Sequence, residues 1–226
     1  MVIVRDVEWR RSLLGPELPT GEVHLWLANL DVEADDTHLL SAQECERAAK
    51  FRFDHHRRRW TAARVLLRRV LGRYLATAPE SVVLEEGEHG RRVVGWPHGS
   101  EWLSFSPSRS GDLALVAVAR GQSVGVDVER VRADLDFVAI ARRALGDEVA
   151  DQLEAERAKD RISAFFRAWV REEARGKCRG TGLVELDDEA RHVPLFVADL
   201  AVGDGYAGAL ATDGELGTVR GCSLKV

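Results

Sequence analysis

The sequence predicts an α+β fold in which two similar α/β halves pack against each other as an intramolecular pseudo-dimer. Residues 57–75 and 160–178 show the three- and four-residue apolar spacing of amphipathic helices. Each helix contains a tryptophan followed four positions later by a charged residue, and each leads into a strand-rich segment. This repetition divides the chain into an N-terminal repeat, 1–119, and a C-terminal repeat, 120–226.

The composition is that of an ordinary globular protein in a reducing compartment. The 226 residues are 45% apolar and 31% charged, with a net charge of −5. No run of eighteen apolar residues is present, and the N-terminus lacks a signal-peptide pattern. The three cysteines are odd in number and lack zinc-ligand spacing. We therefore expect a cytoplasmic protein without a membrane segment, and we expect it to act as a monomer.

The first half is predicted to contain one strand, two helices and a pair of short strands. Residues 23–27 alternate as a strand, 37–53 form a long helical segment, and 57–75 form the amphipathic helix. Short strands are expected at 82–84 and 92–94, around a glycine-containing turn.

Basic residues concentrate in the helical part of this half. Between Arg47 and Arg73 there are ten basic residues and one acid, Asp54, although the whole chain is acidic. Such a local cluster favours a defined anionic ligand over bulk nucleic acid. An ordinary solvated helix face is the alternative, and at this point it stays open.

The second half is predicted to begin with a hairpin and to continue as helices followed by short strands. Residues 113–119 and 124–129 alternate as strands, and residues 120–123 would form the turn between them. Three helices are expected next, at 136–145, 147–158 and 160–178.

Two acids lie on one face of the second strand of this hairpin. In the run Gly125–Glu129, valines occupy one face, while Asp127 and Glu129 share the other face with the glycine. The glycine leaves room for a ligand or a helix to approach the acidic face. Carboxylate oxygens suit Mg²⁺, which binds substrate phosphates. Strand ends also often contain solvent-facing acids, so a structural role is the alternative for this pair alone.

A third acid lies on the apolar stripe of the helix 160–178. Helical projection places Glu173 in line with Trp169, and Lys177 continues the line. A carboxylate on such a stripe needs a partner. The partner is either Lys177, one turn away, or a metal shared with Asp127 and Glu129. The three acids together favour a Mg²⁺ site beside a phosphate.

These two motifs resemble the signature of the 4′-phosphopantetheinyl transferase superfamily, surfactin-activating type. That family has a Gly-x-Asp-x-Glu strand and a Trp-x-x-Lys-Glu-[Ala/Ser]-x-x-Lys helix, which stand here as Gly125–Glu129 and Trp169–Lys177. The resemblance also covers Phe51–Arg68, Gly90–Arg91 and Phe105–Ser110. As a joint pattern in this order it is specific.

The resemblance implies a reaction, a metal and partners. The family moves the 4′-phosphopantetheine arm of coenzyme A onto a serine of an acyl or peptidyl carrier protein and releases adenosine 3′,5′-bisphosphate. It implies Mg²⁺ ligands at Asp127, Glu129 and Glu173. Glu173 would help to deprotonate the serine, directly or through water, and Lys177 would contact the phosphates, so that Asp127, Glu173 and Lys177 are the catalytic residues. The implied coenzyme A cradle consists of Arg59, Gly90, Arg91, Ser108 and Arg109 together with Lys177.

Three residues depart from the family pattern. Arg109 stands where the family usually has histidine, Arg92 where it has proline, and Glu172 where it has lysine. Glu172 projects about 100° from Glu173 and would lie at the edge of the cleft, with Arg171 as a compensating cation. One alternative is therefore a diverged family member that has lost or repurposed the reaction and binds another phosphorylated ligand. An unrelated Mg²⁺-dependent phosphohydrolase or nuclease is the other.

A carrier-docking surface is expected after the acidic strand. It would combine apolar and basic side chains, namely Leu135, Phe137, Val138, Ile140, Arg130 and Arg132. Carrier proteins are usually acidic, so such a surface would complement them. The alternative is that these apolar residues face the core of the protein itself.

Overall fold

The computed structural model describes residues 7, 9–10, 17–31, 36–87, 92–95, 102–134, 136–181 and 194–225. In this part of the chain helices and strands mix, as the predicted α+β class requires. The helices are α1 (Ala42–Ala49), α2 (Asp54–Leu75), α3 (Phe137–Ala144), α4 (Asp147–Ala155) and α5 (Ala158–Arg179), with 3₁₀ turns η1 (Thr37–Leu39) and η2 (Pro79–Ser81). The strands are β1 (Trp9–Arg10), β2 (Val23–Asn29), β3 (Leu84–Glu86), β4 (Arg92–Val94), β5 (Leu103–Ser110), β6 (Leu113–Arg120), β7 (Val124–Arg130), β8 (Phe196–Leu200), β9 (Tyr206–Thr212) and β10 (Val219–Lys225).

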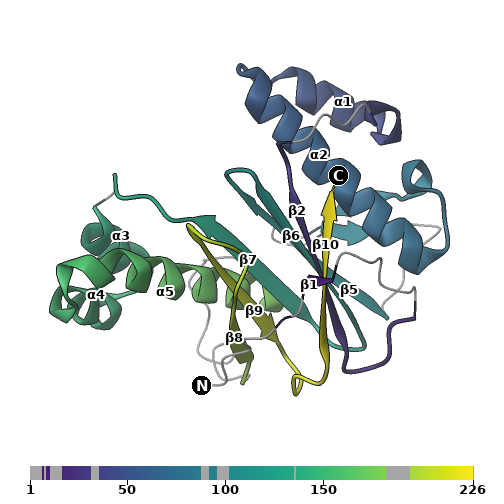
Figure 1. Cartoon of the computed structure of the whole chain (residues 1–226). Coiled ribbons are helices and arrows are strands. Elements are labelled where there is room, and N and C mark those ends of the chain that lie inside the picture. Colours follow the sequence, from purple (N-terminus) through teal and green to yellow (C-terminus); the bar gives the residue numbers. More distant parts are fainter. Residues whose placement is uncertain are drawn as a thin grey trace.

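Two of the sheets stack face to face between two long helices. The larger sheet has the strand order β1-β10-β2-β6-β5, and the smaller one has the order β7-β9-β8. Helix α2 covers the outer face of the larger sheet and α5 covers the outer face of the smaller one (Figure 1). The layers therefore run helix, sheet, sheet, helix. Strands β3 and β4 pair separately.

Strand alternation distributes the core residues between these layers. On β2, Trp26 and Ala28 face α2, whereas Leu25 and Leu27 face the smaller sheet. The three valines of β7 complete this core between the sheets. Because neighbouring residues of a strand point to opposite faces, the acidic side of β7 turns toward α5.

Helix α5 crosses β7 directly at Gly125. A Cβ atom at this position would overlap the carbonyl oxygen of Ala174 and the backbone of Cys178. The glycine therefore admits a helix, which decides between the two explanations that the sequence left open. This close approach brings Glu173 of α5 to the acidic face of β7. Glu173 and the two acids of β7 line the same cavity.

Four of the predicted helices are confirmed, as α2, α3, α4 and α5. The single helix predicted over 37–53 is wrong, because a new helix begins within it. The hydroxyl of Ser41 accepts a hydrogen bond from the amide of Glu44, and the Glu44 carboxylate accepts one from the amide of Ser41. This reciprocal cap fixes the start of α1, so the segment is divided into η1 and α1.

The hairpin predicted from residues 113–119 and 124–129 is also wrong, although both strands exist. β6 pairs with β2 and β5, while β7 pairs with β9. The true hairpin is β5–β6, which turns at Gly111 with φ of +58°. The chain passes from the larger sheet to the smaller one between Arg120 and Val124.

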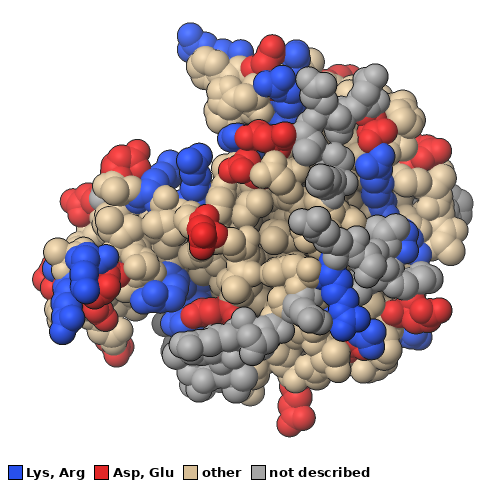
Figure 2. All heavy atoms as spheres, in the orientation of Figure 1, with Lys and Arg blue, Asp and Glu red and all other residues tan. Residues whose placement is uncertain are grey.

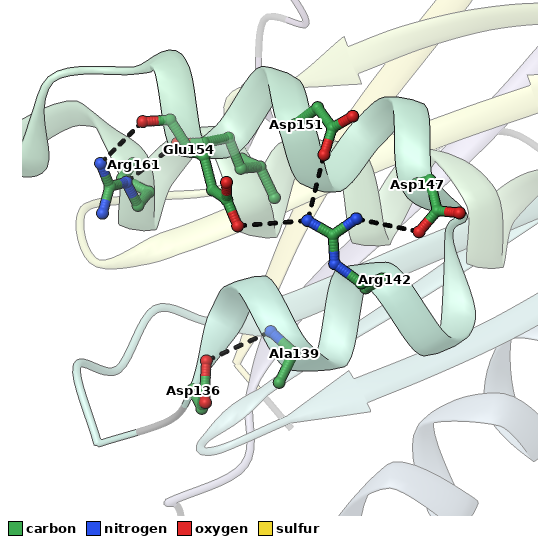
Figure 3. A network of polar contacts seen from close by, with 8 residues as sticks. Asp136, Ala139, Arg142, Asp147, Asp151, Glu154 and Arg161 are labelled. Carbon is green, nitrogen blue, oxygen red and sulfur yellow. Dashed lines mark hydrogen bonds and ion pairs between the residues drawn. The ribbon is translucent and has the colours of Figure 1, made fainter.

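Helices α3 and α4 share an apolar cluster and are also linked by one arginine. Arg142 of α3 donates hydrogen bonds of 2.9 to 3.1 Å to three acids, Asp147, Asp151 and Glu154, all on α4 (Figure 3). Asp136 caps α3 by accepting a hydrogen bond from the amide of residue 139. The pair of helices thereby forms a compact unit beside α5.

The C-terminal strand β10 lies in the sheet of the first half, between β1 and β2 and parallel to both. The division of the chain into two repeats at residue 120 stays a prediction. In the described part of the chain, no helix has the length and apolar character needed to cross a membrane.

A chain of buried polar groups links β2 to α2. His24 is 2% exposed, with Nδ1 2.6 Å from the Tyr74 hydroxyl and Nε2 2.8 Å from the Glu22 carboxylate. The indole of Trp26 donates to the same hydroxyl at 3.0 Å. The Tyr74 hydroxyl is thus free to donate to Nδ1, and Nε2–H donates to Glu22. Both nitrogens of a neutral imidazole are satisfied in this arrangement.

Acidification is expected to destabilise the fold through His24. Burial lowers its pKa below the ordinary value of 6.5, with Glu22 opposing this effect and Arg220 adding to it. The folded state binds the proton of His24 more weakly than the unfolded chain does. The contribution of neutral His24 to the free energy of unfolding is therefore complete above pH 6.5 and is lost as the pH falls through the folded pKa. Urea unfolding should show a slope of at most about 1.4 kcal/mol per pH unit from this proton. His24→Gln should flatten the curve; an unchanged slope in that variant would contradict the assignment.

Candidate active site

A cavity of about 370 Å³ lies where the two halves of the chain meet. Its walls come from α2, β5 and β6 on one side and from β7 and α5 on the other. The lining residues are Trp60, Ala63, Arg64, Leu67, Pro107, Ser108, Arg109, Ala114 and Val116 from the first half, and Asp127, Glu129, Trp169, Glu173 and Lys177 from the second. The three acids of the predicted metal site and Lys177 therefore lie around one cavity.

Asp127 is the most enclosed of these acids, with 3% of its surface exposed. Its Oδ1 accepts hydrogen bonds from the Ser108 hydroxyl and from Lys177 Nζ, each at 2.7 Å. Its Oδ2 is buried without a hydrogen-bond partner among the described residues. A buried carboxylate oxygen without a donor is costly. This oxygen is consequently suited to bind a cation.

The other two acids are destabilised as anions by their surroundings. Burial raises the pKa of Glu129; the hydrogen bond from Ser110 opposes this rise and the charge of Asp127 adds to it. Burial also raises the pKa of Glu173, with Lys177 opposing and the two acids of β7 contributing. A cation that binds between carboxylates in a cavity of low dielectric constant relieves the repulsion between their negative charges.

The donor set fits Mg²⁺, since it consists of carboxylate oxygens and one of them, Asp127 Oδ2, lacks a partner among the described residues. As the side chains stand, no group of three His, Cys, Asp or Glu within the described ranges is arranged to hold a metal ion. Binding would therefore require side-chain adjustment. The assignment of Asp127, Glu129 and Glu173 as metal ligands stays a prediction.

The first half contributes cations to the cavity. Arg64 lies 3.2 Å from the carboxylate of Glu44 and 5.3 Å from the ring centroid of Trp60. The guanidinium of Arg109 reaches solvent, yet the surrounding protein and the charge of Arg47 lower the pKa of Arg109. Guanidinium groups match phosphate oxygens, so Arg64 and Arg109 give the cavity two groups suited to a phosphate.

One described residue of the implied coenzyme A cradle, Arg59, does not line the cavity. Arg59 makes a two-pronged ion pair with Asp31, with both N–O distances 2.6 Å, and lies outside the cavity lining. Gly90 and Arg91 fall outside the described residues. Ser108 and Arg109, in contrast, both line the cavity. Ligand binding by the predicted cradle residues stays a prediction.

The exchanged residue Glu172 lies beside the cavity and does not line it. Its carboxylate pairs with Arg175, one turn along α5. Arg171 is not its compensating cation, because Nε and Nη2 of Arg171 each donate a hydrogen bond of 2.7 Å to the carboxylate of Asp199 on β8. The negative charge of Glu172 is thus balanced locally, and Arg175 takes the part that the sequence suggested for Arg171.

Much of the basic cluster at 47–73 has structural partners. The ion pairs are Arg57–Asp54, Arg59–Asp31, Arg64–Glu44, Arg68–Glu44 and Arg69–Asp36. Arg68 is 2% exposed and also donates to backbone carbonyls that follow α2. On the face shown in Figure 2, acidic and basic side chains are interspersed. The basic member of this cluster that lines the cavity is Arg64.

Three apolar residues of the expected docking surface are partly buried. Phe137, Val138 and Ile140 join the core around Phe165 and Phe166 of α5. Leu135 falls outside the described residues. These three side chains of α3 are partly buried against that core, as the alternative explanation expects, and whether their exposed parts contact a carrier stays a prediction.

Sequence reasoning did not assign the apolar part of the site or Ser110. Trp60, Ala63 and Leu67 of α2 form the stripe that the helical period indicates, and one end of this stripe lines the cavity. Ser110 donates to Glu129 at 2.5 Å. The signal available for Ser110 is the serine at every second position of residues 104–110, a strand pattern.

Comparisons with known proteins identify the family of this chain. A family model described as the 4′-phosphopantetheinyl transferase superfamily matches residues 123–201, which include β7 and α5. The chain is 34% identical over 175 residues to the 4′-phosphopantetheinyl transferase HetI of Nostoc sp. (strain PCC 7120), covering 76% of this chain and 74% of that protein. It is 33% identical over 146 residues to AcpT of Escherichia coli (strain K12), covering 63% and 69%. It is 34% identical over 121 residues to AcpT of Salmonella typhimurium, covering 54% and 58%.

The fold, the acidic cavity and these matches define an enzyme of the phosphopantetheine–protein transferase class. The chain belongs to the 4′-phosphopantetheinyl transferase superfamily, as its two motifs predicted. This family acts on carrier proteins and uses coenzyme A as substrate. An unrelated phosphohydrolase or nuclease is thereby set aside.

Proposed function

We propose that this protein performs Mg²⁺-dependent transfer of the 4′-phosphopantetheine group of coenzyme A to a serine of an apo acyl or peptidyl carrier protein. The observation that supports this most strongly is the single cavity that unites Asp127, Glu129, Glu173 and Lys177 with Arg109. We also propose the surfactin-activating type, because the two halves of one chain together build that cavity.

In the proposed reaction, the carrier serine oxygen bonds to the phosphorus that bears the pantetheine arm. The bond from this phosphorus to the bridging pyrophosphate oxygen breaks, and adenosine 3′,5′-bisphosphate leaves with that oxygen. Glu173 accepts the serine proton, directly or through water. Burial raises the pKa of this carboxyl above its ordinary value, which makes Glu173 a stronger base than an exposed carboxylate.

Lys177 and the acids prepare the site for the two phosphates. Lys177 Nζ lies 2.7 Å from Asp127 Oδ1, which holds the ammonium at the cavity wall where it can donate to phosphate oxygens. Asp127, Glu129 and Glu173 would hold Mg²⁺, which when bound neutralises charge on the pyrophosphate. Arg109 and Arg64 offer guanidinium donors to the 3′-phosphate end.

A second hollow is proposed as the entrance for the carrier serine. It has a volume of about 780 Å³ and is lined by Ser110, Gly111, Glu129, Arg130, Val131, Arg132, Ala133 and Asp134. Glu129 lines both this hollow and the main cavity. The basic pair Arg130 and Arg132 would face an acidic carrier there.

A diverged member without transferase activity is the alternative. Its main support in the sequence was Glu172, whose charge would oppose a phosphate. The pairing of Glu172 with Arg175 outside the cavity removes this objection. The transferase is therefore the better proposal. Because both walls of the cavity come from one chain, we also propose a monomer, and we propose a cytoplasmic location from the cysteine usage.

The proposal is tested by intact-mass measurement of carrier proteins. Purified protein would be incubated with coenzyme A, Mg²⁺ and each of several apo acyl and peptidyl carriers. We expect the mass of phosphopantetheine to be added to at least one carrier, and we expect EDTA to prevent it. No added mass on any carrier would refute the transferase, and transfer unaffected by EDTA would refute the dependence on Mg²⁺.

A further inference from the structure

One edge of β7 is bound by serine side chains of β5. Every second residue from Ser104 to Ser110 is a serine. Their hydroxyls accept hydrogen bonds of 3.1 to 3.3 Å from four amides of β7, those of Val124, Val126, Val128 and Arg130. We call this arrangement the serine ladder.

The ladder exists because β7 pairs with β9 along its other edge. In an antiparallel pair, alternate amides of a strand point away from the partner strand. On β7 these amides face β5, the edge strand of the larger sheet. Serine hydroxyls in place of backbone carbonyls therefore join the two sheets at the wall of the cavity.

Two members of the serine ladder, Ser108 and Ser110, make a second hydrogen bond, in each case to an acid of β7. The Ser108 hydroxyl lies 2.7 Å from Asp127 Oδ1, and the Ser110 hydroxyl lies 2.5 Å from Glu129 Oε2. Each oxygen already accepts a hydrogen bond from a backbone amide, so its own proton is directed to the carboxylate. The ladder thus orients both acids of the site.

We infer that Ser108 and Ser110 are positioning residues that hold the carboxylates of Asp127 and Glu129 for a divalent cation. With Oδ1 of Asp127 bound by Ser108 and Lys177, the other oxygen, Oδ2, is left for the cation. Ligating carboxylates commonly receive such outer hydrogen bonds, which fix their orientation. This inference rests on the metal site of the proposed function.

The sequence offers a matched control in the same ladder. Ser106 accepts a hydrogen bond from the amide of Val126 at 3.1 Å, as Ser110 does from that of Arg130. At the corresponding place on the acidic face of β7, however, stands Gly125, which has no side chain. Ser106→Ala therefore removes the same backbone contact as Ser110→Ala and leaves the acids untouched.

The test measures metal binding without coenzyme A or carrier. The full chain would be titrated with Mn²⁺, and free Mn²⁺ would be followed by electron paramagnetic resonance. Ser108→Ala and Ser110→Ala should each weaken Mn²⁺ binding by about tenfold, whereas Ser106→Ala should change it by less than about twofold. Ser110→Thr retains a hydroxyl and should stay within about threefold of the unmodified protein. Urea midpoints of the three alanine variants should fall by similar amounts.

The outcomes separate this inference from the proposed function. Unchanged Mn²⁺ affinity in Ser108→Ala and Ser110→Ala would overturn the inference, and so would equal weakening by Ser106→Ala. Absence of Mn²⁺ binding by the unmodified protein would overturn it as well. Serine-dependent Mn²⁺ binding in a protein that modifies no carrier would uphold the inference while the transferase proposal fails. Transfer to a carrier by a protein whose Mn²⁺ binding does not depend on the serines would uphold the transferase proposal and overturn the inference.

Discussion

Glu173→Gln is expected to lower the rate of phosphopantetheine transfer by about a thousandfold, because it removes the proposed proton acceptor while it keeps the size of the side chain. Glu173 lines the cavity with Lys177 and both acids of β7. Glutamine cannot accept the serine proton, and its neutral amide is a weaker ligand for a hard cation. Single-turnover transfer to a carrier, followed by intact mass, would measure the loss.

Glu172→Gln is the matched control for this prediction. Glu172 is the neighbour of Glu173 on the same helix, but it pairs with Arg175 outside the cavity. Losing this partly exposed pair should change the transfer rate by less than about twofold. If both variants transferred at similar rates, the assignment of Glu173 as proton acceptor would be wrong. Circular dichroism and urea unfolding would show that both variants are folded.

The acids of the site were predictable because local periodicity determines their direction. The two-residue period of β7 separates Asp127 and Glu129 from the valines, and the period of α5 aligns Glu173 with Trp169. Neither argument requires knowing which other strand or helix packs against β7 or α5. The prediction that Glu172 lies at the edge of the cleft rather than inside it agrees, for the same reason, with its absence from the cavity lining.

What the sequence could not predict depends on partners that are distant along the chain. The strand that pairs with β7 is β9, which follows about eighty residues later, so the hairpin pattern at 113–129 was misleading. Arg59 faces Asp31, which precedes it by 28 residues. Helical position alone cannot reveal such an acid. The serine ladder likewise needs the relative placement of two sheets.

Gly125→Ala is expected to lower the free energy of unfolding by about 3 kcal/mol, because α5 leaves no room for a methyl group on β7. The added Cβ would overlap two backbone groups, the carbonyl of Ala174 and the amide of Cys178. Backbone cannot rotate away as a side chain can, so α5 must move as a unit. Equilibrium unfolding in urea would measure the loss.

The same displacement should also impair transfer, since α5 positions Glu173 and Lys177 against β7. A shift of about 1 Å in a reacting group can cost about a hundredfold in rate. Gly214→Ala is the control, because its Cβ would meet only the flexible end of Gln122; its stability should change by less than about 0.5 kcal/mol. Equal stability of the Gly125→Ala and Gly214→Ala proteins would contradict the close crossing of α5 over β7. A stability loss in Gly125→Ala with full transfer activity would instead separate the packing of α5 from the geometry of the site.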